Sequence, residues 1–528
     1  MRFFKFSALC LLVSSIFLAS CGQQQMSKQD VLTAMDSLEQ RYEWLEYQMA
    51  LQYWDMYTVG QADSLDYYQK LQRKLFNDDD LIQILQNGGN LLSKEEDQRG
   101  RQIMLSSLLH GKIEAGFAIA TLRDSLAKLS SQFRAEFEGE KRTSSYLYEI
   151  QRYDPNRRRR ESAFRATVAL GDQLAEGVEQ LFRYRNQAAK RLGFNSFLAV
   201  VFRHCGLNQQ EYKAYLNRVE ELSRKRYLDI LDNIKVKLDV EQPELWDLGF
   251  GYADINRAVD RYFPADSQLA FIKSSLKAMG FNLDKLPVYF DLDSRENKTQ
   301  FSFCFPVKPP HDVRVLGNLA DAQYSAWNLL HEVGHALHFT HIDQEREIFA
   351  RGIDGVWMEG MAAIIDNLIY EKEWLVKYAK MPPQLVDSYL ESREEQEIIW
   401  LRRILLLLDF EYEAYANPNR DLNKLYWDLY SKYLKLPRHE QFKIWALVTH
   451  YANIPAYMQN YFYADMISAQ TQNKLRETYG NLIDNTDVSA FLIQNYYRFG
   501  SRYDWRELLQ RGTDEELNFE YLVKAYGL

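Results

Sequence analysis

Apolar residues recur at spacings of three and four along most of the chain. The segments 42–57, 174–193 and 212–238 all show this spacing. It places the apolar side chains on one face of an α-helix. Glycine (24) and proline (12) are sparse among the 528 residues, so few positions interrupt the pattern. It predicts a mostly α-helical protein in which residues 31–528 form a single domain without internal repeats.

The pattern changes between residues 299 and 318. Phenylalanines alternate with smaller residues over 301–305, and valines alternate with charged residues over 312–315. This period of two predicts two strands of a hairpin, joined by a turn at 308–311. The helical pattern then resumes at once, and Asn318 is a candidate cap for the next helix.

The first twenty residues have a different character. Arg2 and Lys5 precede an apolar run that ends in small residues before Cys21. We interpret residues 1–20 as a secretory signal, too short for an ordinary membrane span. The ending resembles a bacterial lipobox, which implies a lipidated Cys21, a polar tether at 21–30 and a membrane anchor. The alternative is a plain signal peptide with an incidental cysteine.

Charge excludes one class of partner. Residues 1–20 contain two basic and no acidic residues, so the remaining chain has 62 basic and 73 acidic residues and a net charge of −11. Nucleic-acid binding needs a basic surface, so we expect no nucleic-acid partner. The four arginines at 157–160 are predicted to form a solvated, salt-bridged helix face, with Asp154 as a possible cap. Cys205 and Cys304 could form a disulfide in an oxidising compartment.

Histidines cluster in the predicted helix that follows the hairpin, in LLHEVGHALHFTH at 329–341. His331 and His335 are four residues apart, so on a helix they lie on one face, one turn apart. Glu332 is turned about 100° from His331 and can approach a water molecule bound to a metal. This HExxH pattern predicts one Zn²⁺ held by His331 and His335, with Glu332 as general base.

A third ligand is needed, and His341 is the first candidate. It would complete HExxHxxHxxH, close to the metzincin pattern HExxHxxGxxH, but His338 stands where that pattern has the glycine that ends the helix. If the helix continues, His341 lies about 9 Å along the axis from His335 and about 240° around it. His338 lies about 10 Å along the axis from His331. We therefore expect neither histidine to bind the metal. His338 is expected to line the cleft, or to lie in the core or at the surface.

A carboxylate on the next helix is the second candidate. Glu359 lies in the strongly apolar segment 355–370, whereas Glu345 and Glu347 lie in a charged, solvated stretch. An acid among apolar neighbours should be buried, and a buried charge needs a partner such as zinc. Asp366, two turns further along the same face, could hold a ligand imidazole or form a salt bridge to a neighbouring helix.

HExxH with a glutamate 24 residues after the second histidine resembles the gluzincin arrangement. More narrowly, HEVGHALH and HDVRVLGN resemble segments of the angiotensin-converting enzyme (peptidyl-dipeptidase A) family and the related thimet oligopeptidase and neurolysin family. The segments 181–194 and 504–522 also resemble these families. The resemblance implies a large helical zincin-type ellipsoid with a deep central cleft between two subdomains. A small β hairpin or sheet would lie beside the active-site helix.

The same families use downstream histidine and tyrosine donors that bind the substrate carbonyl. The similar stretch here is 449–468, in which His450, Tyr457 and Tyr461 match best. The spacing differs by about one residue, so the two tyrosines could exchange roles. The resemblance implies that these side chains stabilise an oxyanion, although at least one tyrosine is expected to pack in the core.

The chain also departs from the converting enzymes. Val448 stands next to the place of a lysine that holds the substrate's terminal carboxylate, and no chloride-binding arginine is evident near Met458 and Gln459. The strand that carries a histidine in those enzymes reads FSFCFPV here. Release of C-terminal dipeptides and activation by chloride therefore do not follow from the resemblance.

These observations predict an exported zinc metallopeptidase that hydrolyses short peptides, of the peptidyl-dipeptidase or oligopeptidase type. We expect a monomeric bacterial lipoprotein, anchored through Cys21 and facing the periplasm or the cell surface. One alternative is a metzincin-like protease that uses His341. Another is a lipoprotein that binds peptides without cutting them, although a binding protein has no need of a general base at Glu332.

Overall fold

A computed structural model describes residues 26–528. The predicted signal at 1–20 and the lipidation site at Cys21 lie outside the described residues. Helix α1 begins at Lys28, inside the predicted tether, because the side chain of Ser27 accepts a hydrogen bond from Asp30 and Asp30 bonds back to Ser27. The N-terminal helices are α1 (Lys28–Val59), α2 (Leu65–Phe76), α3 (Asp79–Asn87), α4 (Glu95–Glu114) and α5 (Phe117–Gln132).

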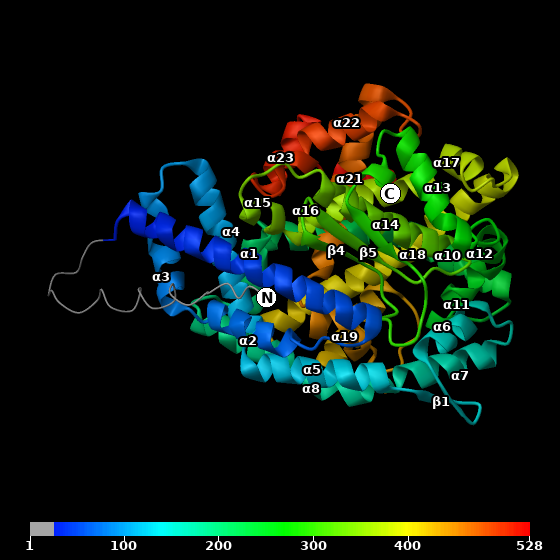
Figure 1. Cartoon of the computed structure of the whole chain (residues 1–528). Coiled ribbons are helices and arrows are strands. Elements are labelled where there is room, and N and C mark those ends of the chain that lie inside the picture. Colours follow the sequence, from blue (N-terminus) through cyan, green and yellow to red (C-terminus); the bar gives the residue numbers. More distant parts are fainter. Residues whose placement is uncertain (1–25) are drawn as a thin grey trace, which may run out of the picture.

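Helices make up most of the chain, as the spacing of apolar residues predicts (Figure 1). The segments predicted to be helical at 42–57, 174–193 and 212–238 lie within or largely within α1, α8 and α10. The helices between the N-terminal group and the main sheet are α6 (Ser144–Tyr153), α7 (Arg157–Val168), α8 (Leu170–Arg191), α9 (Phe197–His204), α10 (Gln209–Leu238), α11 (Leu245–Leu248), α12 (Ala253–Asp260) and α13 (Ala265–Ala278).

The predicted hairpin is present and belongs to a three-stranded sheet. Strand β4 (Phe303–Lys308) pairs antiparallel with β5 (Asp312–Leu316), in a register that sets Cys304 opposite Val315. Strand β3 (Val288–Asp291) pairs parallel with the other edge of β5. The four residues of β3 are too few to show a period, so sequence analysis missed this strand. It also missed the short hairpin of β1 (Ala135–Phe137) and β2 (Glu140–Arg142).

Two predicted helix caps are wrong. Helix α14 begins at Gln323 rather than next to Asn318, whose side-chain amide donates to the carbonyl of Thr299 at 2.7 Å. Helix α7 is capped by Asn156, not by Asp154. Asn318 bonds to a segment nineteen residues away, which local sequence does not reveal. Asp154 instead accepts a hydrogen bond from the backbone N–H of Asn156 and pairs with Arg159, which leaves the cap position to Asn156.

The arginine run at 157–160 is only partly solvated. Arg160 is 2% exposed and forms a 2.7 Å ion pair with the buried Asp247, which also pairs with Arg157. Arg159 pairs with Glu138 and Asp154, as a salt-bridged helix face would. The prediction of a solvated face is therefore wrong for Arg160, because Asp247, almost ninety residues away in sequence, supplies a buried counter-charge.

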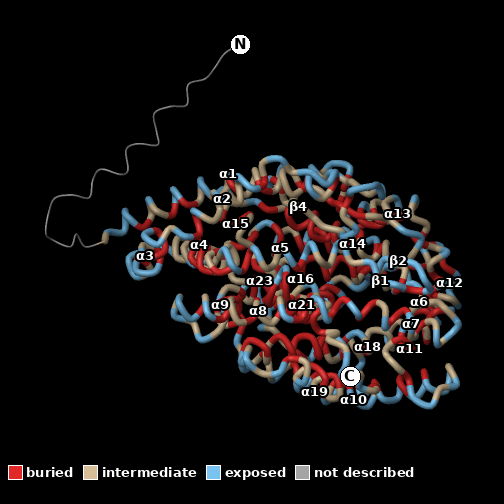
Figure 2. The backbone as a smooth tube through the Cα atoms, turned by 90° about the horizontal axis from the view of Figure 1, so that it is seen from below, coloured by how far each residue is buried: buried red, intermediate tan, exposed pale blue. Residues whose placement is uncertain are grey.

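The remaining helices follow the sheet along the chain, and two of them carry the predicted metal ligands. They are α14 (Gln323–Thr340), α15 (Glu347–Arg351), α16 (Gly355–Asp366), α17 (Lys372–Lys377), α18 (Pro383–Ala416), α19 (Leu422–Tyr433), α20 (Thr449–Asn453), α21 (Met458–Tyr479), α22 (Thr486–Asn495), α23 (Trp505–Thr513) and α24 (Glu520–Ala525). Ten of the twelve residues of α16 are buried, and α16 and α21 run through the interior (Figure 2).

Within residues 26–528, length and composition allow no single helix to cross a membrane, although α4 and α5 together pass the same test as a pair bent by 67°.

Candidate metal centre

Helix α14 holds the HExxH residues in one unbroken helical segment. It runs from Gln323 to Thr340 and therefore continues past His338, as predicted from the lack of a helix breaker. His331 and His335 lie one turn apart on this helix, with their ring centroids 4.7 Å apart. The helix packs beside strands β4 and β5 (Figure 1).

Small residues let helix α16 approach α14 closely. A Cβ atom on Gly334 would lie 2.9 Å from the Cα atom of Ala362, so a larger residue would push the two helices apart. Asp354 caps α16 by accepting a hydrogen bond from the backbone N–H of Trp357 at 3.0 Å. This close packing brings Glu359, 24 residues after His335, against the two histidines.

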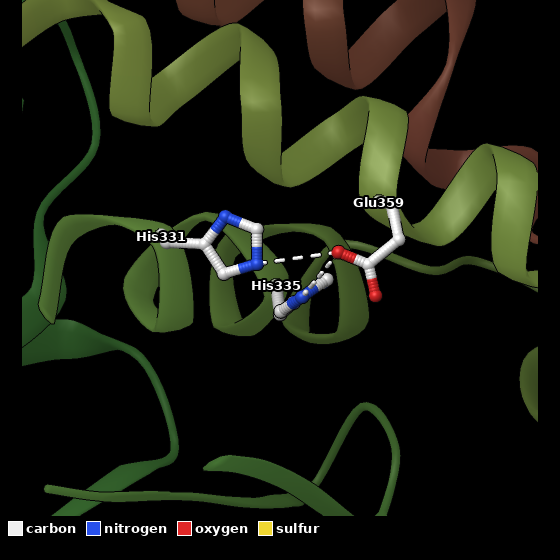
Figure 3. Close-up of side chains that lie close together, drawn as sticks. All are labelled: His331, His335 and Glu359. Carbon is white, nitrogen blue, oxygen red and sulfur yellow. Dashed lines mark ion pairs between the residues drawn. The ribbon is translucent and has the colours of Figure 1, made fainter. Parts of the chain in front are cut away.

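The three predicted ligands converge (Figure 3). Oε2 of Glu359 lies 3.3 Å from Nε2 of His331 and 3.7 Å from Nε2 of His335. Ligand atoms about 2.0–2.1 Å from a tetrahedral zinc would lie about 3.3 Å apart, so this spacing fits the ion. Oε2 is buried and has no hydrogen-bond partner among the described residues. A carboxylate oxygen and two imidazole nitrogens are ligands that zinc prefers.

Asp366 lies behind His331. Its Oδ2 atom is 2.7 Å from Nδ1 of His331, and the indole of Trp327 also donates to this carboxylate. A histidine that donates Nδ1–H to a carboxylate keeps the lone pair of Nε2 for a metal. Of the two roles predicted for Asp366, the geometry therefore favours holding a ligand imidazole over a salt bridge between helices.

Replacing Asp366 with asparagine should weaken zinc binding by about 10–100-fold, the usual effect of losing such an outer partner. Asparagine keeps the size of the side chain but lacks the charge that orients the imidazole. Competition with a chelating dye measures the affinity. Asp343→Asn removes an exposed carboxylate and should leave affinity unchanged. Equal affinities in wild type and Asp366→Asn would contradict this role.

Glu332 is buried beside the two histidines. It is 8% exposed, and burial raises the pKa of its carboxyl to about 7, although the charge of His331 opposes this rise. The backbone N–H of Cys304 on β4 bonds to the carboxyl group and favours its charged form. A carboxylate whose pKa lies near neutrality suits proton transfer at physiological pH. Nothing in the local sequence around Glu332 indicates this backbone partner, which comes from a separate strand.

The downstream donors occupy two different positions. The hydroxyl of Tyr457 donates to Oε1 of Glu359, so this tyrosine holds a predicted ligand. Tyr461 makes no such bond to Glu359 among the described residues. Its ring centroid lies 6.0 Å from that of His450 and 5.6 Å from that of Tyr457. Burial raises the pKa of Tyr461, and the charges of Glu359 and Glu332 raise it further, so its hydroxyl keeps its proton.

The other two histidines of the cluster lie away from the ligand triad. His338 is fully buried, and its ring centroid lies 5.3 Å from that of Tyr497. Neither ring nitrogen of His338 forms a hydrogen bond with a described residue. His341 follows the end of α14, and its Nδ1 lies 2.7 Å from the carbonyl of Leu337. Both act as packing residues in this structure, which agrees with their prediction as bystanders. The thiols of Cys205 and Cys304 are free.

Comparison with known proteins bears on the fold and on the class of the protein. A family model described as "Carboxypeptidase Taq (M32) metallopeptidase" matches residues 201–362, a range that includes all three predicted ligands. A solved structure described as "PZ PEPTIDASE A with inhibitor 2" superposes with a TM-score of 0.69 over 95% of this chain and 94% of that chain, at 16% identity. No curated protein matches the chain.

The fold is therefore the mostly α, zincin-like peptidase fold that was predicted. Together, the family match and the metal-ligand cluster support a zinc metallopeptidase. The resemblance to the converting enzymes and the thimet oligopeptidases is supported only at this broader level, because the matching family model is that of the M32 metallopeptidases.

Proposed function

We propose that this chain is a zinc-dependent peptidase that hydrolyses short peptides. The observation that carries the proposal is the convergence of His331, His335 and Glu359 within 4.8 Å of one another, with Glu332 on the same helix. These three side chains would hold one zinc ion. When bound, zinc supplies a Lewis acid that polarises the substrate carbonyl and lowers the pKa of a water molecule.

The side chains around this position have separate tasks. The carboxylate of Glu332 accepts a proton from the attacking water and passes it to the leaving amine. The hydroxyl of Tyr461 and the imidazole of His450 donate hydrogen bonds to the carbonyl oxygen as it gains negative charge. Burial lowers the pKa of His450, so a neutral ring with one N–H is available. Tyr457 and Asp366 orient Glu359 and His331.

The two tyrosines should respond differently to loss of the hydroxyl group. Tyr461→Phe should lower kcat by about 10²–10³-fold with normal zinc content, because it removes an oxyanion donor. Tyr457→Phe should mainly weaken zinc binding, because its hydroxyl bonds to Glu359. Steady-state kinetics with metal analysis separates the two effects. A lower kcat with full zinc content in Tyr457→Phe, together with a normal kcat in Tyr461→Phe, would show that Tyr457 rather than Tyr461 is the oxyanion donor.

Digestion of a mixed peptide library tests the proposed activity. The zinc-loaded protein should cleave peptides, and a chelator should stop the cleavage. Sequencing the products from peptides with free and amidated C-termini distinguishes release of dipeptides from internal cleavage. It also tests release of single C-terminal residues, which the description of the M32 family model suggests. Absence of chelator-sensitive cleavage would support a peptide-binding lipoprotein instead.

We also propose export and anchoring through a lipid on Cys21, from the signal-like residues 1–20 alone. Membrane anchoring by lipidation needs no spanning helix. Expression of the full chain and of Cys21→Ser in a bacterial host tests this proposal. The unchanged chain should fractionate with membranes and the variant should not. Equal membrane fractions for both proteins would contradict the lipid anchor.

A further inference from the structure

A polar pocket of about 400 Å³ lies outside the candidate metal centre. It is lined by the end of α3 and the turn after it, by α4, by the turn after α8 and by α9. None of its lining residues belongs to α14, α16, α20 or α21. Figure 2 shows α3, α4 and α9 on one side of the molecule. Ligand pockets commonly have volumes of about 300–1,000 Å³, so this one can admit a small organic molecule.

Two arginines line this pocket without a carboxylate partner. Arg101 donates from Nη1 to the carbonyl of Leu85 at 2.7 Å, but its buried Nε has no partner within residues 26–528. Arg203 lies with its Cζ atom 5.8 Å from the ring centroid of Phe194 and forms no ion pair with a described residue. A planar guanidinium carries five N–H donors, so most donors of these two side chains have no hydrogen-bond partner among the described residues.

The two positive charges line the same pocket. Partial burial lowers the pKa of Arg101, and the charge of Arg203 lowers it further. Among the described residues, no aspartate or glutamate lines the pocket, and the remaining polar side chains are the amides of Gln86, Asn87 and Asn90. The pocket therefore offers positive charge and hydrogen-bond donors on a chain whose net charge is negative.

Two fully buried arginines elsewhere in this protein are neutralised by carboxylates. Arg160 pairs with Asp247 at 2.7 Å, and Arg185 pairs with Glu114 at 2.7 Å. By contrast, Arg101 is half-buried, Arg203 is exposed, and neither forms an ion pair with a described residue. Both charges are therefore open to an anion that enters the pocket from solvent.

We propose that this pocket binds a small organic anion that carries phosphate or carboxylate groups. Guanidinium groups bind both oxyanions through paired N–H···O hydrogen bonds. Arg101 would contact the anion from α4 and Arg203 from α9, while the amides bind polar groups on the rest of the ligand. Gly89 makes room for Arg101, because a Cβ atom there would lie 2.9 Å from its Cζ atom.

Isothermal titration calorimetry of the zinc-loaded full chain tests the site. The probes are inorganic phosphate, glycerol phosphate and succinate at constant ionic strength. Each variant removes the charged partner of a hydrogen bond to the anion, so Arg101→Gln and Arg203→Gln should each weaken binding by about tenfold or more. The phosphate probes distinguish a phosphate site from a carboxylate site, which succinate reports.

Arg158→Gln is the matched control, because Arg158 is exposed on α7 and its side chain pairs with no described residue. It removes the same charge and should leave affinity unchanged. Arg101→Gln removes the hydrogen bond to the carbonyl of Leu85 and could therefore disturb the fold. The side chain of Arg203 forms no hydrogen bond or ion pair with a described residue, so a weaker affinity in Arg203→Gln reports on the anion alone. The proposal is overturned if none of the three anions binds. It also fails if binding is the same in wild type and in the double variant, as it would be for an anion bound at the metal centre.

Discussion

Replacing Glu332 with glutamine is expected to lower kcat/KM for peptide hydrolysis by about 10²–10⁴-fold, the usual contribution of a general base. Glutamine has nearly the same shape and can still accept the hydrogen bond from the N–H of Cys304, but it cannot take a proton from water. Because Glu332 is not one of the three converging ligands, the variant should keep its zinc. Steady-state kinetics with metal analysis of the same sample makes the measurement.

Glu345→Gln provides the matched control for this experiment. Glu345 is exposed, lies thirteen residues along the chain from Glu332, and forms no ion pair with a described residue. Its replacement removes the same charge and should leave kcat/KM unchanged. Normal activity in Glu332→Gln would rule out Glu332 as the general base and leave the peptide-binding alternative open.

Replacing Glu359 with alanine is expected to weaken zinc binding by more than about 100-fold and so to remove activity. Replacing a residue that only hydrogen-bonds to a metal ligand typically weakens metal binding by about 10–100-fold. Glu359 is itself one of the three predicted ligands, so its loss should weaken binding further. The variant also takes away the acceptor of the Tyr457 hydroxyl. Zinc affinity by dye competition and activity with added zinc are the two measurements.

His341→Ala discriminates between the two candidates for the third ligand. His341 lies beyond the end of α14 and packs against Phe281 and Tyr497, with ring centroids at 5.7 and 6.2 Å. Its loss should cost some stability but leave zinc bound. Loss of zinc in His341→Ala together with normal zinc in Glu359→Ala would establish the metzincin-like alternative.

The parts of the fold that depend on local periodicity were predictable. The helices α1, α8 and α10 and the hairpin of β4 and β5 all follow from the spacing of apolar residues. Strand β3 was not predictable, because its four residues are too few to show a period and its partner β5 lies more than twenty residues along the chain. The cap at Asn318 was wrong because a distant carbonyl competes for that side chain, and the cap at Asp154 was wrong because Asn156, two residues later, takes the cap position.

The candidate site was likewise predictable only in part. A helix has a fixed geometry, so the spacing of His331 and His335 was enough to place both on one face and to remove His338 and His341 from the ligand set. Glu359 was found because an acid in an apolar segment needs a partner. The roles of Tyr457 and Tyr461 could not be separated, because they depend on which tyrosine reaches Glu359.

The sequence by itself determined a mostly helical chain with an HExxH helix, a buried glutamate on a later helix and a hairpin before them. Each of these features depends on residues close together in the chain. Only the tertiary structure decided that Gly334 lets α16 approach α14, that Asp366 reaches His331 and that the backbone of β4 bonds to Glu332. These contacts join segments whose separation is set by packing, and packing distances are not encoded in any local pattern.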